Sequence, residues 1–285
     1  MEARMNKPAE VIEKNMKAGE EKARLPLGRM ILLGVMAGAF IAMGGAASST
    51  VMHGIENVGL SRMAAGAIFP VGLMMIVFVG GELFTGNCLV VLDVIDKRVS
   101  LKRAICSLGV VYFSNLIGAL IIDVLVFLSG NLDYTEGMLG AFAIKTALAK
   151  VSITPVKGIA SGILCNIFVC IAILMATAAK DITGKVWAIF FPIMAFVAGG
   201  FEHCVANMFY IPIGILAAGN EMYAARALEL YGIAQEELQR LTILNSLHNF
   251  LPVTLGNMLG GMLFVGVPCY LVYKKKWGAA TGRSI

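Results

Sequence analysis

The chain has 285 residues, of which 58% are hydrophobic and 14% are charged. Soluble globular domains carry about 25% charged residues, so this composition excludes a soluble domain and indicates a protein that crosses a membrane several times. The net charge of +5 does not indicate nucleic-acid binding, because the basic residues gather in segments that would face one side of a membrane.

The first 29 residues are charged and precede the first apolar stretch. Within them, residues 8–24 have a helical pattern in which Ala9, Ile12, Met16 and Ala23 form a thin apolar stripe. We expect a cytoplasmic amphipathic helix here, lying on the membrane surface or against a neighbouring subunit. A partly ordered, solvated tail is the alternative for so thin a stripe.

Six apolar stretches follow, each near or above the roughly 20 residues that a helix needs to cross a bilayer. They are predicted at approximately 30–52, 64–92, 105–129, 158–179, 187–217 and 247–273. The second and fifth are too long for one straight helix, so we predict an all-α membrane protein with six transmembrane helices, of which the second and fifth are broken in mid-membrane.

The distribution of Lys and Arg predicts the orientation. Seventeen of the 23 Lys and Arg residues lie before the first span, after the second and fourth spans, and after the sixth. Cytoplasmic loops carry such an excess, so we expect a multi-pass protein of the cytoplasmic membrane with both termini in the cytoplasm. Residues 30–273 would form a pore domain and residues 274–285 a cytoplasmic tail.

Each long span carries a polar motif where a lipid-facing helix would be apolar, at residues 80–87 and 199–207. In both motifs Gly-Gly precedes a Glu, which is Glu82 or Glu202, and an Asn follows five residues later, as Asn87 or Asn207. Such residues at bilayer depth are costly unless they line a protected, partly wet cavity. Matching interruptions in two halves of a chain point to a transport site between repeats.

A further pair of matching motifs supports a repeat. Asn115 and Asn257 each begin an Asn-x-x-Gly in the span after the broken one. Three spans per half is an odd number, so the second half must insert upside down relative to the first. We therefore predict two inverted three-helix repeats, at about 30–130 and 158–273.

His203 and Thr85 are the first candidates for function. Imidazole changes charge near neutral pH, so a buried His can stabilise an anion or pass a proton to it. The hydroxyl of Thr85 can donate to an anion or bridge to His203, whereas a bond to its own helix is the structural alternative. A hydrogen bond between helices is the corresponding alternative for His203, and its place beside Glu202 in a Gly-rich break favours function.

Glu82 and Glu202 have two possible roles, carrying protons or satisfying backbone amides freed by the broken helices, and their matching positions favour the second. Asn87 and Asn207 are expected to support the same breaks. Asn166, like Asn115, is a mid-span amide that either faces a pore or holds helices together. Lys150 precedes the fourth span on the predicted outer side, where a cation would concentrate anions. The apolar residues near the breaks are Phe69, Leu73, Phe84 and Phe196, a class that is usually core but can constrict a pore.

These motifs resemble those of the formate/nitrite transporter family. The resemblance lies in Gly-Glu-Leu-Phe-Thr-Gly-Asn (81–87), in Gly-Phe-Glu-His-Cys-Val-Ala-Asn-Met-Phe-Tyr-Ile-Pro (200–212) and in Asn-Phe-Leu-Pro-Val-Thr-Leu-Gly-Asn-Met-Leu-Gly-Gly (249–261). The three strings occur in the expected order, the second is highly specific, and the resemblance covers nearly the whole chain.

The resemblance implies an aquaporin-like subunit that assembles as a pentamer, with one pore in each subunit. It assigns Thr85, His203 and Asn166 to the pore and Lys150 to a vestibule, and it gives the constrictions to Phe69, Leu73, Phe84 and Phe196. Segments 86–95 and 8–24 would be associated with gating. Members of the family differ in preferred substrate among formate, nitrite, hydrosulfide and lactate-like acids.

We therefore expect a channel or transporter in the lipid bilayer for a small monovalent anion, with formate first and nitrite or hydrosulfide next. In this hypothesis His203 protonates the anion, or shares a proton with it, so that a near-neutral species crosses the apolar constrictions. A neutral-solute channel is the second reading, but Asn-Pro-Ala is absent from both breaks. An intramembrane enzyme is disfavoured because the sequence lacks His-Glu-x-x-His and Gly-x-Ser-x-Gly, and no metal or cofactor is expected.

Overall fold

The computed structural model describes residues 5–274. Its regular elements are helices, which in chain order are α1 (Pro8–Ala23), α2 (Leu27–Met52), α3 (Val58–Ile68), α4 (Pro70–Val79), α5 (Phe84–Asn87), η1 (Cys88–Val90), α6 (Val91–Ile95), α7 (Leu101–Leu128), η2 (Asn131–Asp133), α8 (Met138–Val151), α9 (Pro155–Ala178), α10 (Ile182–Ala198), α11 (Cys204–Ala218), α12 (Glu221–Tyr231), α13 (Gln235–Leu238), α14 (Ile243–Leu259), η3 (Gly260–Gly266, a π-helix) and α15 (Val267–Tyr273). The predicted all-α class is confirmed.

Five helical stretches in the described part of the chain are long and apolar enough to cross a membrane, namely Leu27–Met52, Val58–Val79, Leu101–Leu128, Pro155–Ala178 and Ile243–Tyr273. The predicted fifth span does not form one such helix. It is divided between α10 and α11, which are apolar but shorter. The polar break separates them, so length alone recovers five of the six predicted spans.

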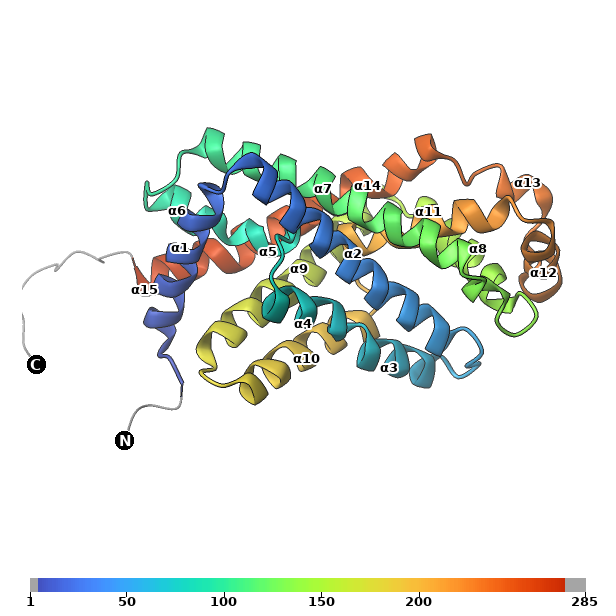
Figure 1. Cartoon of the computed structure of the whole chain (residues 1–285), viewed down its shortest axis with the longest axis horizontal. Helices are drawn as coiled ribbons and strands as arrows, with labels where there is room; N and C mark the ends of the chain where they lie inside the picture. Colours follow the sequence, from blue (N-terminus) through green and yellow to red (C-terminus); the bar gives the residue numbers. More distant parts are fainter. Residues whose placement is uncertain (1–4, 275–285) are drawn as a thin grey trace, which may run out of the picture.

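The molecule is elongated along one axis, as Figure 1 shows. α1 and α15 lie at one end of this axis, and α12 and α13 lie at the other. The short helices α5 and α11 begin between the two ends. We refer below to the α1 side, which holds α1 and α15, and to the α12 side, which holds α12 and α13.

The long helices approach closely where their sequences are rich in glycine, because a residue without a Cβ atom lets two backbones come near each other. A Cβ atom built on Gly38 of α2 would lie 1.9 Å from the carbonyl oxygen of Asn115 in α7, and one built on Gly162 of α9 would lie 2.7 Å from that of Val253 in α14. No larger side chain fits at either crossing. Each contact holds the Asn-x-x-Gly helix of one half beside the break that it serves.

Both predicted breaks are present. Residues 80–83 separate α4 from α5, and residues 199–203 separate α10 from α11. The backbone turns at Gly80, with φ of +104°, and at Gly200, with φ of +69°. Residues with a Cβ atom rarely adopt such conformations, which explains the glycines of the two motifs.

The N-terminal segment differs from its expected surroundings. The buried side of α1 is formed by Val11, Ile12, Met16 and Ala23, whereas Ala9 is exposed. Ile12 and Met16 pack with Leu92 and other apolar residues of this same chain. The apolar stripe of α1 therefore packs against other residues of the protein's own chain, and it is not left exposed for a membrane surface or a neighbouring subunit.

The segment between the third and fourth spans, for which no element was predicted, is also helical. It contains α8, which buries Leu139, Ile144 and Leu148 against the rest of the chain and ends next to Lys150. The segment after the fifth span forms the two short helices α12 and α13. The predicted tail, 274–285, lies outside the described residues except for Lys274.

Candidate functional site

Each break is held by an asparagine from the helix that follows it. Asn115 accepts a hydrogen bond from the backbone N–H of Phe84 at 2.9 Å and donates to the carbonyls of Glu82 and Gly34, both at 2.8 Å. The side-chain amide therefore replaces backbone partners that the missing helical turn would have supplied.

Asn257 repeats this arrangement in the second half. It accepts from Cys204 N–H at 2.8 Å and donates to the carbonyls of Gly162 and Glu202 at 2.8 and 3.0 Å. Sequence analysis had noticed both asparagines as a repeat but had left open whether such amides face a pore or hold helices. The structure assigns these two to the backbone.

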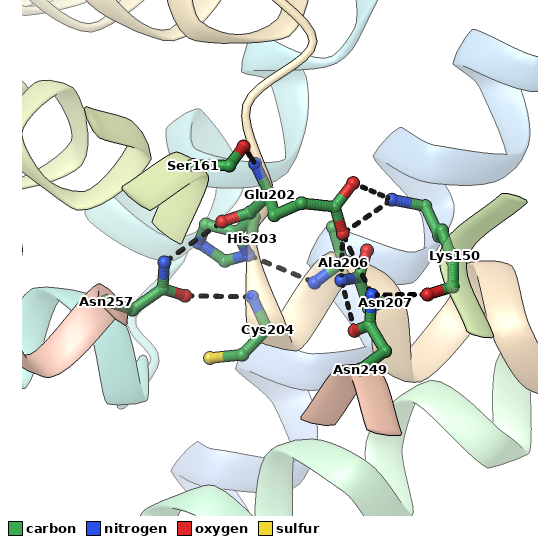
Figure 2. A network of polar contacts seen from close by, with 9 residues as sticks. All are labelled: Lys150, Ser161, Glu202, His203, Cys204, Ala206, Asn207, Asn249 and Asn257. Atoms are coloured by element: carbon green, nitrogen blue, oxygen red, sulfur yellow. Dashed lines mark hydrogen bonds and ion pairs between the residues drawn. The ribbon is translucent and has the colours of Figure 1, made fainter. Parts of the chain in front are cut away.

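Glu202 lies in a polar network on the α12 side of its break, which Figure 2 shows. Lys150 donates to both carboxylate oxygens of Glu202, at 2.9 and 3.1 Å. Asn207 and Asn249 donate to one of the same oxygens, at 2.6 and 3.1 Å. The Lys150 and Glu202 side chains are only 14% and 12% exposed, so this pair holds opposite charges in a partly dry place and adds no net charge.

Glu82 has a similar set of partners on the α1 side. Asn87 donates to Glu82 at 2.7 Å, matching the bond from Asn207 to Glu202. Lys22 of α1 lies 3.4 Å from the Glu82 carboxylate and donates to the side-chain oxygen of Asn87 at 3.2 Å. Each glutamate thus has one lysine and the asparagine five residues after it, Glu202 has Asn249 in addition, and the two lysines come from α8 and α1.

Thr85 and His203 meet between these two networks. The Thr85 hydroxyl lies 3.0 Å from Nε2 of His203, and both residues are buried. Residues from the two breaks, 118 positions apart in sequence, therefore form one polar contact in the interior. This is the contact that sequence analysis proposed from the repeat.

The other ring nitrogen of His203 has a structural role. Nδ1 accepts the backbone N–H of Ala206 at 3.0 Å, so His203 is the N-cap of α11. A nitrogen that accepts a hydrogen bond carries no proton, so in neutral imidazole the proton is on Nε2 and is donated toward Thr85. The hydroxyl hydrogen of Thr85 is then free to donate to a third group.

One of the four apolar candidates, Phe196, stacks on His203, and a second, Phe69, packs against Phe196. The ring of Phe196 lies parallel to the imidazole at 5.8 Å between centroids, and Phe69 meets Phe196 edge-on at 5.7 Å. Phe84 packs edge-on against Tyr112, at 5.0 Å. Leu73 is buried in the same apolar core. The polar contact is thus enclosed by apolar side chains, and constriction by these four remains a prediction.

Asn166 is fully buried and lies against the backbone of Thr85. Its Nδ2 donates to the carbonyls of Thr85 and Asn257, at 3.1 and 2.7 Å. Its Oδ1 has no hydrogen-bond partner among the described residues. The amide nitrogen therefore fixes the Thr85 backbone, while the oxygen stays available to a hydrogen-bond donor.

A cavity of about 190 Å³ leads toward this site from the α1 side. Its walls include Lys22, Glu82, Asn87 and Gly86, the residue after Thr85. Polar groups thus extend from the surface to the residue next to the buried hydroxyl. Residues of α1, among them Asn15, Ala18 and Lys22, form part of the cavity wall.

Lys22 and Asn249 were not selected from sequence as site residues. Lys22 is one of many charged residues in the first 29, and its partner Glu82 is remote in sequence, so no local pattern marks it. Asn249 stands eight residues before Asn257 in one of the strings that carried the family resemblance. The available signal for Asn249 was that it is an amide within the predicted sixth span, where it could pair with a polar residue of another span such as Glu202.

Comparison with known proteins gives consistent results. A family model described as "Formate/nitrite transporter" matches residues 9–271. A "Probable formate transporter" of Methanothermobacter thermautotrophicus is 35% identical, covering 94% of this chain and 97% of that protein. The "Formate channel FocA" of Escherichia coli (strain K12) is 33% identical, covering 94% and 95%.

Solved structures show the same similarity. A "Pentameric formate channel with formate bound" superposes with a TM-score of 0.80 and 32% identity, covering 87% of this chain and 98% of that one. An "FNT family ion channel" superposes with a TM-score of 0.78 and 28% identity, covering 92% and 98%. The arrangement of helices and breaks described above is therefore similar to that of solved channels.

Proposed function

This chain belongs to the formate/nitrite transporter family, and on that premise we propose that it is a transmembrane channel for small monovalent anions whose substrate is formate. The relatives reported above are named as formate channels or transporters. The observation that carries the proposal is the buried contact of 3.0 Å between Thr85 and His203. It supplies hydrogen-bond donors to an anion inside an apolar enclosure.

The need for such donors follows from the cost of desolvation. Moving an unpaired ion from water into an apolar channel costs far more free energy than moving a polar or neutral group does. In this proposal formate enters the Thr85–His203 contact, where the Thr85 hydroxyl and Nε2–H of His203, which otherwise donates to Thr85, replace part of the water around the anion. The first turn of α11, which begins beside His203, adds the positive end of a helix dipole.

We infer that His203 shares its Nε2 proton with the anion and does not release it. A full transfer from neutral imidazole would leave an imidazolate, and an imidazolium would need a proton on Nδ1, which accepts the Ala206 N–H. A shared proton keeps the cap of α11 intact. Any net proton movement would then accompany the anion as its acid, taken from the solvent at either mouth.

The two Lys–Glu pairs suit the mouths of such a channel. Lys150 pairs with Glu202, the residue before His203, and Lys22 pairs with Glu82, three residues before Thr85, so that each glutamate prevents a permanent excess of positive charge. A balanced mouth attracts an anion weakly, which favours rapid passage over tight binding.

The finer architecture also belongs to the proposal. We propose six spans in two inverted repeats, with α10 and α11 together forming the fifth span, and with both termini in the cytoplasm. The matched hydrogen bonds of Asn115 and Asn257 support the repeat. A homopentamer embedded in the lipid bilayer is supported by the pentameric relative. Phe69, Leu73, Phe84 and Phe196 would narrow the pore on either side of the polar contact.

Flux into proteoliposomes that contain the purified chain tests the proposal. Formate, nitrite, hydrosulfide and glycerol are compared at about pH 5.5 and 7.5, with protein-free vesicles as the control for the leak of neutral acids. We expect formate to be fastest and glycerol to stay at the leak rate. Faster nitrite or hydrosulfide would change the substrate and keep the channel, whereas equal flux of glycerol and anions would overturn the anion pore.

A further inference from the structure

The break at Gly199 and Gly200 has a second cation beside it. Arg62 of α3 is exposed, and its guanidinium lies over Gly200. A Cβ atom built on Gly200 would lie 3.2, 3.4 and 3.5 Å from Nη1, Cζ and Nη2 of Arg62. The planar group therefore covers the backbone two residues before Glu202, on the side of the break where Lys150 lies.

Arg62 and Lys150 share a neighbour. The Nζ atom of Lys150 lies 5.2 Å from the centroid of the Tyr210 ring. The charge of Arg62 also interacts with the Tyr210 side chain. Lys150 therefore lies over the Tyr210 ring, and Arg62 is close enough for its charge to act on the same side chain, at the α12-side mouth of the proposed pore.

The two cations differ in their partners. Lys150 is paired with Glu202, whereas the Arg62 guanidinium has no hydrogen bond or ion pair within residues 5–274. Three other arginines of the described chain, Arg24, Arg98 and Arg226, are paired with carboxylates, and the Arg226 guanidinium binds Glu229 at 2.7 Å and Glu136 at 3.3 Å. Arg62 thus leaves a full positive charge and a set of unused donors at this mouth.

We propose that Arg62 recognises the anion at the α12-side mouth, before it reaches Lys150 and the buried Thr85–His203 contact. The inference rests on the proposed function and adds a residue that selects the anion. A guanidinium presents parallel N–H groups that match two coplanar oxygens, as in a carboxylate or nitrite. Because the group is exposed, water competes for it, and the contact is short-lived enough to release the anion inward.

The chemistry also predicts discrimination among anions. Formate and nitrite offer two oxygens to the guanidinium, whereas hydrosulfide offers one sulfur. A lysine at position 62 keeps the charge but loses the planar pair of donors. Charge alone steers every anion equally, so only the two-oxygen anions lose recognition when the arginine becomes a lysine.

Initial rates of labelled formate uptake by intact cells that express the full chain test this role, because every copy then has one orientation. The wild type is compared with Arg62→Gln, Arg62→Lys and the matched control Arg226→Gln, at two ionic strengths. For Arg62→Gln we expect the half-saturating formate concentration to rise about threefold or more, with an unchanged maximal rate and a weaker salt dependence. Arg62→Lys restores the salt dependence but not the half-saturating concentration, and Arg226→Gln matches the wild type.

Two other results overturn the inference. A wild-type saturation curve in Arg62→Gln shows that the guanidinium takes no part in recognition. A fall in maximal rate alone, equal in Arg62→Gln and Arg62→Lys, shows that the residue only supports the fold around Gly200. Absence of uptake by the wild type above cells lacking the protein is distinguishable from both, since it removes the proposed function itself.

Discussion

Asn257 serves three backbone groups with one side chain: Glu202 in the break, Cys204 at the start of α11 and Gly162 in α9. Asn257→Asp keeps the shape but removes the two N–H donors to Gly162 and Glu202. Buried carbonyls without donors cost about 1–3 kcal/mol. We expect the free energy of unfolding of Asn257→Asp, measured by thermal or denaturant unfolding in detergent, to be about 1–3 kcal/mol lower than that of the wild type.

The control for this prediction is Asn245→Asp, because Asn245 lies in the first turn of α14, whose cap is Thr242, and its side chain donates only to the nearby carbonyl of Arg240. A loss of less than about 0.5 kcal/mol is expected there. Equal stability of the two variants would contradict the role assigned to Asn257.

His203 combines two roles that a substitution can separate. Asparagine is a preferred N-cap residue, so His203→Asn keeps a side-chain acceptor for Ala206 N–H. Its shorter side chain does not reach Thr85 as the imidazole does. We expect near wild-type unfolding and a loss of formate flux of about tenfold or more, the usual effect of removing a hydrogen bond to a charged group.

A different pattern for His203→Asn would change the account. Full flux with normal stability would show that the imidazole is only a cap. Stability and flux should be measured on the same preparation, so that loss of folded protein is not mistaken for loss of transport.

At the level of elements, each break needs a glycine that adopts a positive φ, whereas a glycine inside a regular helix such as α7 has no such requirement. Gly200→Ala would place a Cβ at φ of +69° and within 3.2 Å of Arg62. Such backbone strain costs about 1–3 kcal/mol. We expect a lower unfolding temperature for Gly200→Ala but not for Gly109→Ala, since a Cβ on Gly109 in α7 meets nothing within 4 Å.

The position of α1 depends on an ion-pair cluster at the α1 side. Hydrogen bonds from Lys274 and from Arg98 lower the pKa of Glu13. A carboxyl with a lowered pKa stabilises docking at pH values above its unfolded pKa of about 4.3, and this contribution is lost as the pH falls through the folded pKa. We expect α1 to stay protected from proteolysis between pH 7 and 5 and to lose protection below about 4.

The Glu13→Gln variant should show the weakened protection at neutral pH as well. Glu21→Gln is the matched control, because Glu21 is an exposed carboxylate of the same helix. If α1 is equally protected in both variants and at all pH values, the cluster does not hold it.

Local sequence patterns predicted some elements well and others poorly. The Gly-Gly-Glu and Asn-x-x-Gly motifs marked both breaks and their supports, because backbone bonds lost at a break must be replaced nearby. α8 was not predicted although Leu139, Ile144 and Leu148 have helical spacing, because the segment is too short to be one of the apolar stretches that mark the spans. The partners of α1 are remote in sequence, so the pairing of Lys22 with Glu82 left no local signal.

At the level of the whole molecule, the repeat brings distant residues to one place. Thr85 follows the first break and His203 ends the second, and neither half alone contains both. The matched glutamates then place the Lys22–Glu82 pair on the α1 side and the Lys150–Glu202 pair on the α12 side. A single buried contact between two balanced mouths is the arrangement on which the account of anion passage depends.

Formate flux through the Thr85→Val variant in proteoliposomes tests that claim most directly, because valine keeps the shape of threonine and removes only the hydroxyl. Thr50→Val is the matched control, since the Thr50 hydroxyl bonds to a carbonyl of its own helix. The account predicts a loss of about tenfold or more for Thr85→Val and none for Thr50→Val. Equal formate flux in the two folded variants would contradict passage by way of the Thr85–His203 contact.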